Sequence, residues 1–154
     1  MSDDPFRPPD SELRTSARKP LYSINGVLIA TFCGSLAAGI ILIYLNYVSL
    51  GHNKLAKLTV RWGVVGYMLI IALSSVIPPL PIYIVLVTIV QVGLAGIAAR
   101  SLQGAAIDYH REHSGMMHSL LRAAGLGVLT GIVMFFGLGL LVAALLTVTS
   151  APSA

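Results

Sequence analysis

The chain has 154 residues, of which 56% are hydrophobic and only 10% are charged. Soluble domains carry about 25% charged residues, so this composition excludes a soluble globular protein. The net charge is +4, an excess that is typical of membrane proteins whose loops face anionic lipid. No basic stretch alternates with aromatic residues as in proteins that bind single strands, so we expect no nucleic-acid partner.

The Lys and Arg residues fall in three blocks, at residues 7–19, 54–61 and 100–122. The stretches between and after these blocks carry no charge, and each exceeds the about 20 apolar residues that cross a bilayer. The sequence therefore predicts an all-α integral membrane protein with four transmembrane helices in two hairpins, at residues 21–150. Prolines and mixed charges predict a disordered N-terminal tail at residues 1–20.

The first span is expected at residues 24–50. About 27 residues at about 1.5 Å each reach about 40 Å, so this helix must tilt, bend or extend beyond the hydrocarbon. Its middle is rich in small residues, and Ser35 and Gly39 are spaced four apart. Residues at that spacing lie on one helix face and let a second helix approach closely, so we interpret the pair as a helix contact.

Asn46 lies near the end of the first span, next to Tyr47. An amide in hydrocarbon is costly unless it is paired, but a side chain near a helix end can reach the headgroups. We therefore expect Asn46 and Tyr47 to anchor the span at the interface, with a specific polar contact of Asn46 as the alternative.

The connection at residues 51–61 places Lys54, Lys57 and Arg61 three and four residues apart. On a helix they share one face while Leu55 and Leu58 lie on another, as in a helical turn that rests on lipid headgroups. The alternative, which the pattern favours, is that these cations only set the orientation of the chain.

The second span is expected at residues 60–77 and the third at residues 81–99, joined by a tight turn that contains Pro78, Pro79 and Pro81. Gln91 lies in the middle of the third span. A glutamine at that depth usually bonds a neighbouring helix, and we adopt this interpretation. A solute pathway is the alternative.

Residues 100–122 form a sizeable polar connection. Their early residues predict that the third helix continues past the membrane until Ser114 and Gly115 break it. The fourth span follows at residues 125–148. Its Gly127 and Gly131 form a Gly-x-x-x-Gly pair, which favours close helix packing.

One segment is rich in side chains of the types that bind metals or transfer protons. It contains Asp108, His110, Glu112, His113 and His118. His110 and His113 are three residues apart, rather than the four of a zinc-protease motif. We therefore expect a solvated loop whose histidines titrate near neutral pH, with no metal site. The sequence shows no nucleophile elbow, phosphate-binding loop or pair of intramembrane carboxylates, so we expect no catalytic residue, no cofactor and no enzymatic activity.

Two stretches carry a resemblance to a known group. The first is Leu-Ala-Ala-Gly at residues 36–39, followed by Asn-Tyr-x-x-Leu-Gly at residues 46–51. The second joins the prolines at residues 78–81 to Leu-Gln-Gly at residues 102–104 and to His110. In these features the chain resembles a group of small uncharacterised bacterial multi-pass membrane proteins. The resemblance implies membership of this group and a bacterial origin, and it carries no activity.

From these features we expect a non-enzymatic inner-membrane protein that acts through helix–helix contacts with itself or with a membrane partner. The alternatives are a small transporter or channel subunit and an accessory subunit of a membrane enzyme. If all four spans cross, the positive-inside rule places the two basic connections in the cytoplasm, and both termini and the proline turn outside. Arg18 and Lys19 oppose that orientation, whereas a re-entrant first segment satisfies every charged block.

Overall fold

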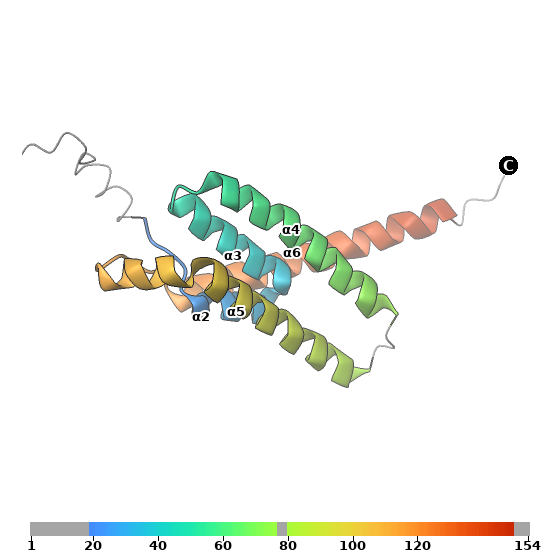
Figure 1. Cartoon of the computed structure of the whole chain (residues 1–154). Helices are drawn as coiled ribbons and strands as arrows, with labels where there is room; N and C mark the ends of the chain where they lie inside the picture. Colours follow the sequence, from blue (N-terminus) through green and yellow to red (C-terminus); the bar gives the residue numbers. More distant parts are fainter. Residues whose placement is uncertain (1–18, 77–79, 150–154) are drawn as a thin grey trace, which may run out of the picture.

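The computed structural model describes residues 19–76 and 80–149, and within them every regular element is an α-helix. The helices, labelled in Figure 1, are α2 (Ile24–Gly34), α3 (Leu36–Ser49), α4 (Asn53–Ser75), α5 (Pro81–Glu112) and α6 (Leu120–Thr149). The expected all-α class is thereby confirmed. The tail expected at residues 1–20, apart from its last two residues, and the prolines Pro78 and Pro79 lie outside the described residues.

Three of these helices are long and apolar enough to cross a membrane, namely α4, α5 and the part of α6 at Leu120–Leu141. The first segment is not among them, because Ser35, whose φ is 77°, breaks it into α2 and α3. The two pieces have 11 and 14 residues, fewer than the about 20 that cross a bilayer. The expected first span is therefore not one helix, and the count of four spans is not confirmed.

The helices α2 and α3 form an antiparallel hairpin. At its open end the backbone N–H of Tyr22 donates to Oδ1 of Asn46 at 2.7 Å, and Nδ2 of Asn46 donates to the Tyr22 carbonyl at 2.9 Å. After the bend at Ser35, the chain thus returns to the end of the hairpin at which α2 begins. Each arm reaches about 20 Å at most, which is less than the about 30 Å of hydrocarbon in a bilayer.

This hairpin is the core of the protein, and the three long helices surround it (Figure 1). The helix α6 packs mainly along α2, α4 packs along α3, and α5 contacts both arms. In the most apolar stretch of each long helix, only 6% of α4, 11% of α5 and 6% of α6 is buried inside the protein. Most of their remaining residues are partly or fully open to lipid or to other chains.

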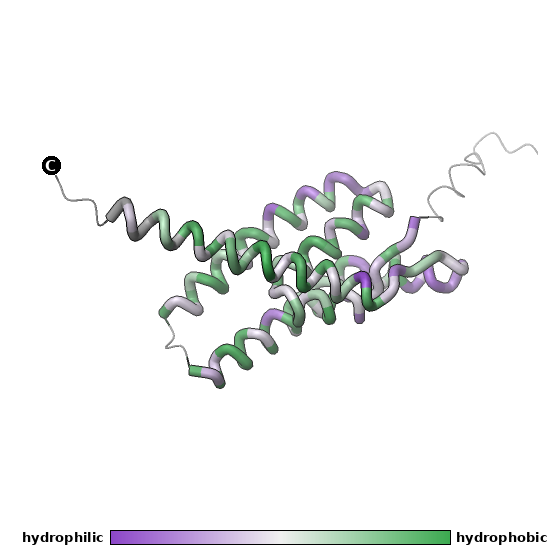
Figure 2. Tube along the Cα trace, turned by 180° about the vertical axis from the view of Figure 1, so that it is seen from behind, coloured by the Kyte–Doolittle hydropathy of each residue, from purple (hydrophilic) through white to green (hydrophobic). Residues whose placement is uncertain are grey.

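Charged residues gather at one end of the molecule, around the open end of the hairpin, as the hydrophilic colours in Figure 2 show. The Lys and Arg residues in the described part of the chain are Lys19, Lys54, Lys57, Arg61, Arg100, Arg111 and Arg122. The C-terminal end of α6 lies at the opposite end (Figure 2). This arrangement supports the re-entrant alternative, in which one side of the membrane carries every charged block.

The connections follow the sequence pattern closely. The helix α5 continues past the expected end of the third span to Glu112, and the chain then turns at Ser114, whose φ is 58°. The helix α4 already begins at Asn53, so Lys54 and Arg61 lie within its first turns. The basic connection is therefore helical. This agrees with the interpretation of these residues as a helical turn that rests on lipid headgroups.

The hairpin predicts which residues share a side of the membrane. We expect single cysteines in a Cys33→Ala background to distinguish two topologies by their reaction with a membrane-impermeant maleimide. Lys19→Cys and Glu112→Cys should react from one side and Leu80→Cys from the other, because the hairpin returns the chain whereas α4 crosses. All three residues are exposed. Labelling that puts Lys19 and Leu80 on the same side would indicate four complete spans instead.

Candidate functional site

The break between α2 and α3 is held by polar side chains from two neighbouring helices. Oε1 of Gln91, in α5, accepts the backbone N–H of Leu36 at 2.8 Å. Oγ of Ser35 lies 3.4 Å from the hydroxyl oxygen of Tyr67, in α4. The first N–H groups of a helix have no partner inside it, so Gln91 supplies an acceptor that lipid lacks. Gln91 therefore bonds a neighbouring helix, as we interpreted it. Ser35 lies at the break rather than on a helix face with Gly39.

A second polar group closes the open end of the hairpin. Asn46 is completely buried, and its Nδ2 also donates to Oε1 of Gln103 at 3.0 Å. Nε2 of Gln103 in turn donates to the Ile43 carbonyl at 2.7 Å. These bonds tie α3 to α5 and to the start of α2. Asn46 thus makes the specific polar contact that was the alternative, and the expected anchoring among headgroups is wrong for this residue.

Sequence reasoning missed Gln103, although a signal was present. Ala99, Gln103, Ile107 and His110 recur at helical spacing, and the structure buries all of them along α5. A polar residue on a face of this kind indicates a buried hydrogen bond. The pattern does not name the partner, because Asn46 is 57 residues away in the sequence.

Each long helix approaches the hairpin through a glycine. A Cβ added to Gly63 of α4 would lie 2.7 Å from the side chain of Ile40, and one added to Gly96 of α5 would lie 2.8 Å from a leucine of α2. A Cβ added to Gly127 of α6 would lie 2.6 Å from the Ala30 carbonyl oxygen. Real Cβ atoms essentially never come within 3.0 Å of another group. At Gly127 the obstacle is backbone, so the absence of a side chain is what lets α6 reach the hairpin, whereas at Gly63 and Gly96 the obstacle is a side chain.

The glycines singled out by their spacing lie in these contacts. Gly127 and Gly131 face α2, and a Cβ added to Gly131 would lie 3.2 Å from Cα of Gly34. Gly39 faces α2 and α5, where its added Cβ would lie 3.2 Å from Cβ of Ala95. The crossing of α2 and α6 is tighter still, because a Cβ added to Gly34 would overlap the Gly127 carbonyl.

The connection between α5 and α6 folds over the start of the hairpin. The N–H of Leu21 donates to the Met116 carbonyl at 3.1 Å, and the N–H of His118 donates to the Leu21 carbonyl at 2.9 Å. The rings of Tyr22 and His118 stack, with centroids 4.3 Å apart. We call Leu21, Tyr22, Met116 and His118 the clasp, since these residues tie the chain before α2 to the chain before α6.

The clasp changes the interpretation of the histidine segment. His110 is 8% exposed and its Nε2 lies 3.1 Å from the Met116 carbonyl oxygen, so this residue supports the clasp instead of lying in a solvated loop. His113 is exposed and stacks on Tyr109, with ring centroids 4.0 Å apart. In the part of the chain that the structure describes, no three His, Cys, Asp or Glu side chains are grouped as a metal site.

The clasp predicts a pH dependence of stability. Burial, followed by the positive charge of Arg122, lowers the pKa of His118 below its ordinary value of 6.5. Nη1 of Arg122 lies 3.3 Å from Nδ1 of His118, which suits a neutral ring. Because the folded state binds this proton less firmly, the contribution to stability is complete above pH 6.5 and is lost as the pH falls through the lowered pKa.

We therefore expect acidification from about pH 7.5 to about pH 5 to lower the unfolding midpoint in mixed detergent, and to lower it less in His118→Phe. Phenylalanine keeps a ring against Tyr22 but cannot titrate. The measurement is helical circular dichroism during a detergent titration at each pH. Parallel curves for the two proteins would exclude His118 as the source of the dependence.

A cavity of about 430 Å³ adjoins the hairpin tip. It is lined by Phe32, Ile84, Val85, Thr88, Ile89 and Val92. These walls are apolar apart from one hydroxyl group, so the cavity suits hydrocarbon better than an ion. Among the described residues, every buried side-chain nitrogen or oxygen has a hydrogen-bond partner. Of these groups, Asn46 and Gln103 hold the hairpin together and His110 supports the clasp.

Comparison of the chain with models of known protein families, with curated protein sequences and with solved structures gives no match. The resemblance that the short motifs indicate therefore stays a prediction.

Proposed function

We propose that the protein is a non-enzymatic multi-pass protein of the bacterial inner membrane that acts by helix–helix contact with a second membrane-embedded chain. That chain is either another copy of the protein or a different membrane protein. The observation that carries the proposal is the outer half of α6, which projects away from the other described helices (Figure 1). The one-sided charge supports an orientation with the polar end in the cytoplasm.

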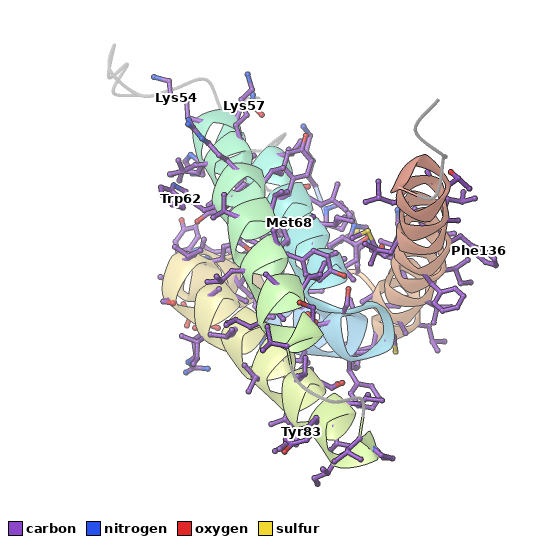
Figure 3. All side chains as sticks on the ribbon, turned by 90° about the vertical axis from the view of Figure 1, so that its right-hand side faces the viewer. Lys54, Lys57, Trp62, Met68, Tyr83 and Phe136 are labelled. Carbon is purple, nitrogen blue, oxygen red and sulfur yellow. The ribbon has the colours of Figure 1, made fainter. Side chains whose placement is uncertain are left out.

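The helix α6 has two different faces. Ala123, Gly127 and Gly131 pack toward α2. The opposite side, which we call the outer α6 face, consists of Ile132, Phe135, Phe136, Gly139 and Ala143, at three- and four-residue spacing. Phe135 is 75% exposed and Phe136 is 64% exposed, and Figure 3 shows Phe136 pointing away from the other helices.

The outer α6 face has the composition of a helix contact. A Cβ added to Gly139 would meet nothing within 4 Å, and Ala143 lies one turn further along the helix. Small residues four apart let a second helix approach closely, and the flanking phenylalanines add contact area on either side. Glycine destabilises a helix interior by about 1 kcal/mol relative to alanine, so lipid contact alone gives no reason for Gly139.

A small transporter or channel subunit is the second candidate, because helices broken inside a membrane often line substrate sites. Three observations favour helix–helix contact with a second chain, which we call the docking role, over transport. Gln91 already accepts the N–H of Leu36 at the break, Asn46 and Gln103 bond each other, and the adjoining cavity is apolar. An accessory subunit of a membrane enzyme remains a form of the main proposal, in which the partner is the enzyme.

The test replaces Phe136 with a photo-activatable phenylalanine analogue in native membranes. We expect one discrete protein adduct on illumination, whose mass distinguishes a second copy from a different chain. The matched control carries the analogue at Ile97 of α5, which is 69% exposed, and should yield lipid adducts only.

A second arm of the test uses glycine substitutions. Gly139→Leu should abolish the protein adduct at position 136, because leucine keeps a partner helix at a distance. Gly66→Leu is the control, since Gly66 of α4 also has open space around it and lies on another helix. Lipid adducts alone at position 136 would refute the docking role, and a protein adduct that survives Gly139→Leu would refute the proposed contact face.

A further inference from the structure

The helix α4 begins with an exposed cationic side. Lys54, Lys57 and Arg61 are all exposed, and their spacing of three and four residues places them on one side of its first turns. Figure 3 shows Lys54 and Lys57 together at the end of α4. The side chains therefore form a compact group of positive charge at the polar end of the molecule.

Nothing on α4 itself offsets this charge. Its first turn contains no acid, and His52 at its N-terminal boundary makes no capping bond through its side chain. The N-terminal end of a helix dipole is also positive, so it adds to the charge of the lysines. The acids in the described part of the chain are Asp108 and Glu112, which belong to the last turns of α5. An anion at this end of α4 would therefore stabilise it.

An apolar stripe runs along the side of α4 that adjoins the cations. It consists of Leu58, Trp62, Val65 and Leu69, which follow at three- and four-residue spacing and are 49%, 65%, 55% and 60% exposed. Trp62 lies one residue beyond Arg61. Tryptophan is enriched at the level of the lipid headgroups, so its position marks where the charged group gives way to hydrocarbon.

We propose that these two adjoining sides of α4 form a binding site for an anionic phospholipid. The phosphate accepts hydrogen bonds from Lys54, Lys57 and Arg61, and one acyl chain lies along Trp62 and the stripe below it. An acidic protein segment would match the cations but leave the apolar stripe uncovered. The site is separate from the outer α6 face and does not depend on a protein partner.

The experiment uses Trp62, the one tryptophan of the chain, as its reporter. The protein is reconstituted into phosphatidylcholine vesicles that contain an equal fraction of either brominated phosphatidylglycerol or brominated phosphatidylcholine. Bromine on an acyl chain quenches an indole that it touches. We expect an apparent preference for the anionic lipid of about fivefold or more, which decreases at high salt.

Two variants locate the site. The triple variant Lys54→Gln, Lys57→Gln and Arg61→Gln should be quenched equally by the two lipids. Arg111→Gln, which removes a cation from the extension of α5, should keep the preference. Equal quenching of the wild-type protein by both lipids would overturn the proposal without any variant. A preference that persists in the triple variant would show that the cations of α4 do not hold the headgroup.

Discussion

Gly34→Ala and Gly127→Ala are expected to destabilise the protein more than any other exchange of glycine for alanine. A Cβ on Gly34 would overlap the Gly127 carbonyl, and one on Gly127 would lie 2.6 Å from the Ala30 carbonyl oxygen. In both cases the obstacle is backbone, which cannot rotate away as a side chain can. The helices α2 and α6 must therefore move apart, although their crossing is the main contact of α6 with the core.

The size of this effect follows from what holds helices together in lipid. Lipid chains are as apolar as leucine, so association depends on close approach and dispersion contacts, which are lost together when two helices separate. Overpacking a protein interior costs about 1–3 kcal/mol and occasionally more. Because two backbones collide here, we expect about 3 kcal/mol or more, measured by helical circular dichroism during unfolding in mixed detergent.

The same helix offers matched controls. A Cβ added to Gly125 or Gly137 would meet nothing within 4 Å. Gly125→Ala and Gly137→Ala should therefore be neutral, or should stabilise the protein by up to about 1 kcal/mol, since alanine is the better helix former. If Gly127→Ala unfolds no more readily than Gly137→Ala, the close crossing of α2 and α6 is not what holds α6 in place.

The long helices and their ends could be predicted because local chemistry decides them. Charge-free stretches of sufficient length predicted α4, α5 and α6, and Ser114 with Gly115 predicted the end of α5. The spacing of Lys54, Lys57 and Arg61 suggested a helical turn ahead of the second span, which was expected from residue 60, whereas α4 begins at Asn53. Each of these features depends on residues within a few turns of one another.

The hairpin could not be predicted in the same way, because the Gly34-Ser35 pair at its break does not stand out from the other small residues at positions 34–39. Residues 24–50 contain no proline and no charge, and the break is at Ser35, a residue that membrane helices tolerate. Two signals were available, namely the excess length of about 40 Å and the charged blocks, which a re-entrant first segment satisfies. Gln91 and Tyr67 hold the break from 55 and 32 residues away in the sequence, so a pattern within one segment does not reveal it.

Asn46→Leu is expected to open the hairpin at its polar end. The substitution leaves the Tyr22 N–H, the Tyr22 carbonyl and Oε1 of Gln103 without the partner that each has now. An interhelical hydrogen bond in a membrane averages about 0.6 kcal/mol, because the separated helices also find partners. Here three bonds end on one buried side chain, and a buried group left without a partner costs about 1–3 kcal/mol. We therefore expect a loss of about 2–4 kcal/mol in mixed-detergent unfolding.

The double variant separates hydrogen bonding from packing. Gln103→Leu alone should also destabilise, because it leaves Asn46 and the Ile43 carbonyl with one bond fewer. Combined with Asn46→Leu it should cost clearly less than the sum of the two, since both buried amides are then gone and only the Tyr22 backbone groups stay unpaired. Asn25→Leu, at an exposed position of α2, is the control and should change little. Strict additivity of the two substitutions would mean that Asn46 and Gln103 act independently, and the amide pair would then not be what closes the hairpin.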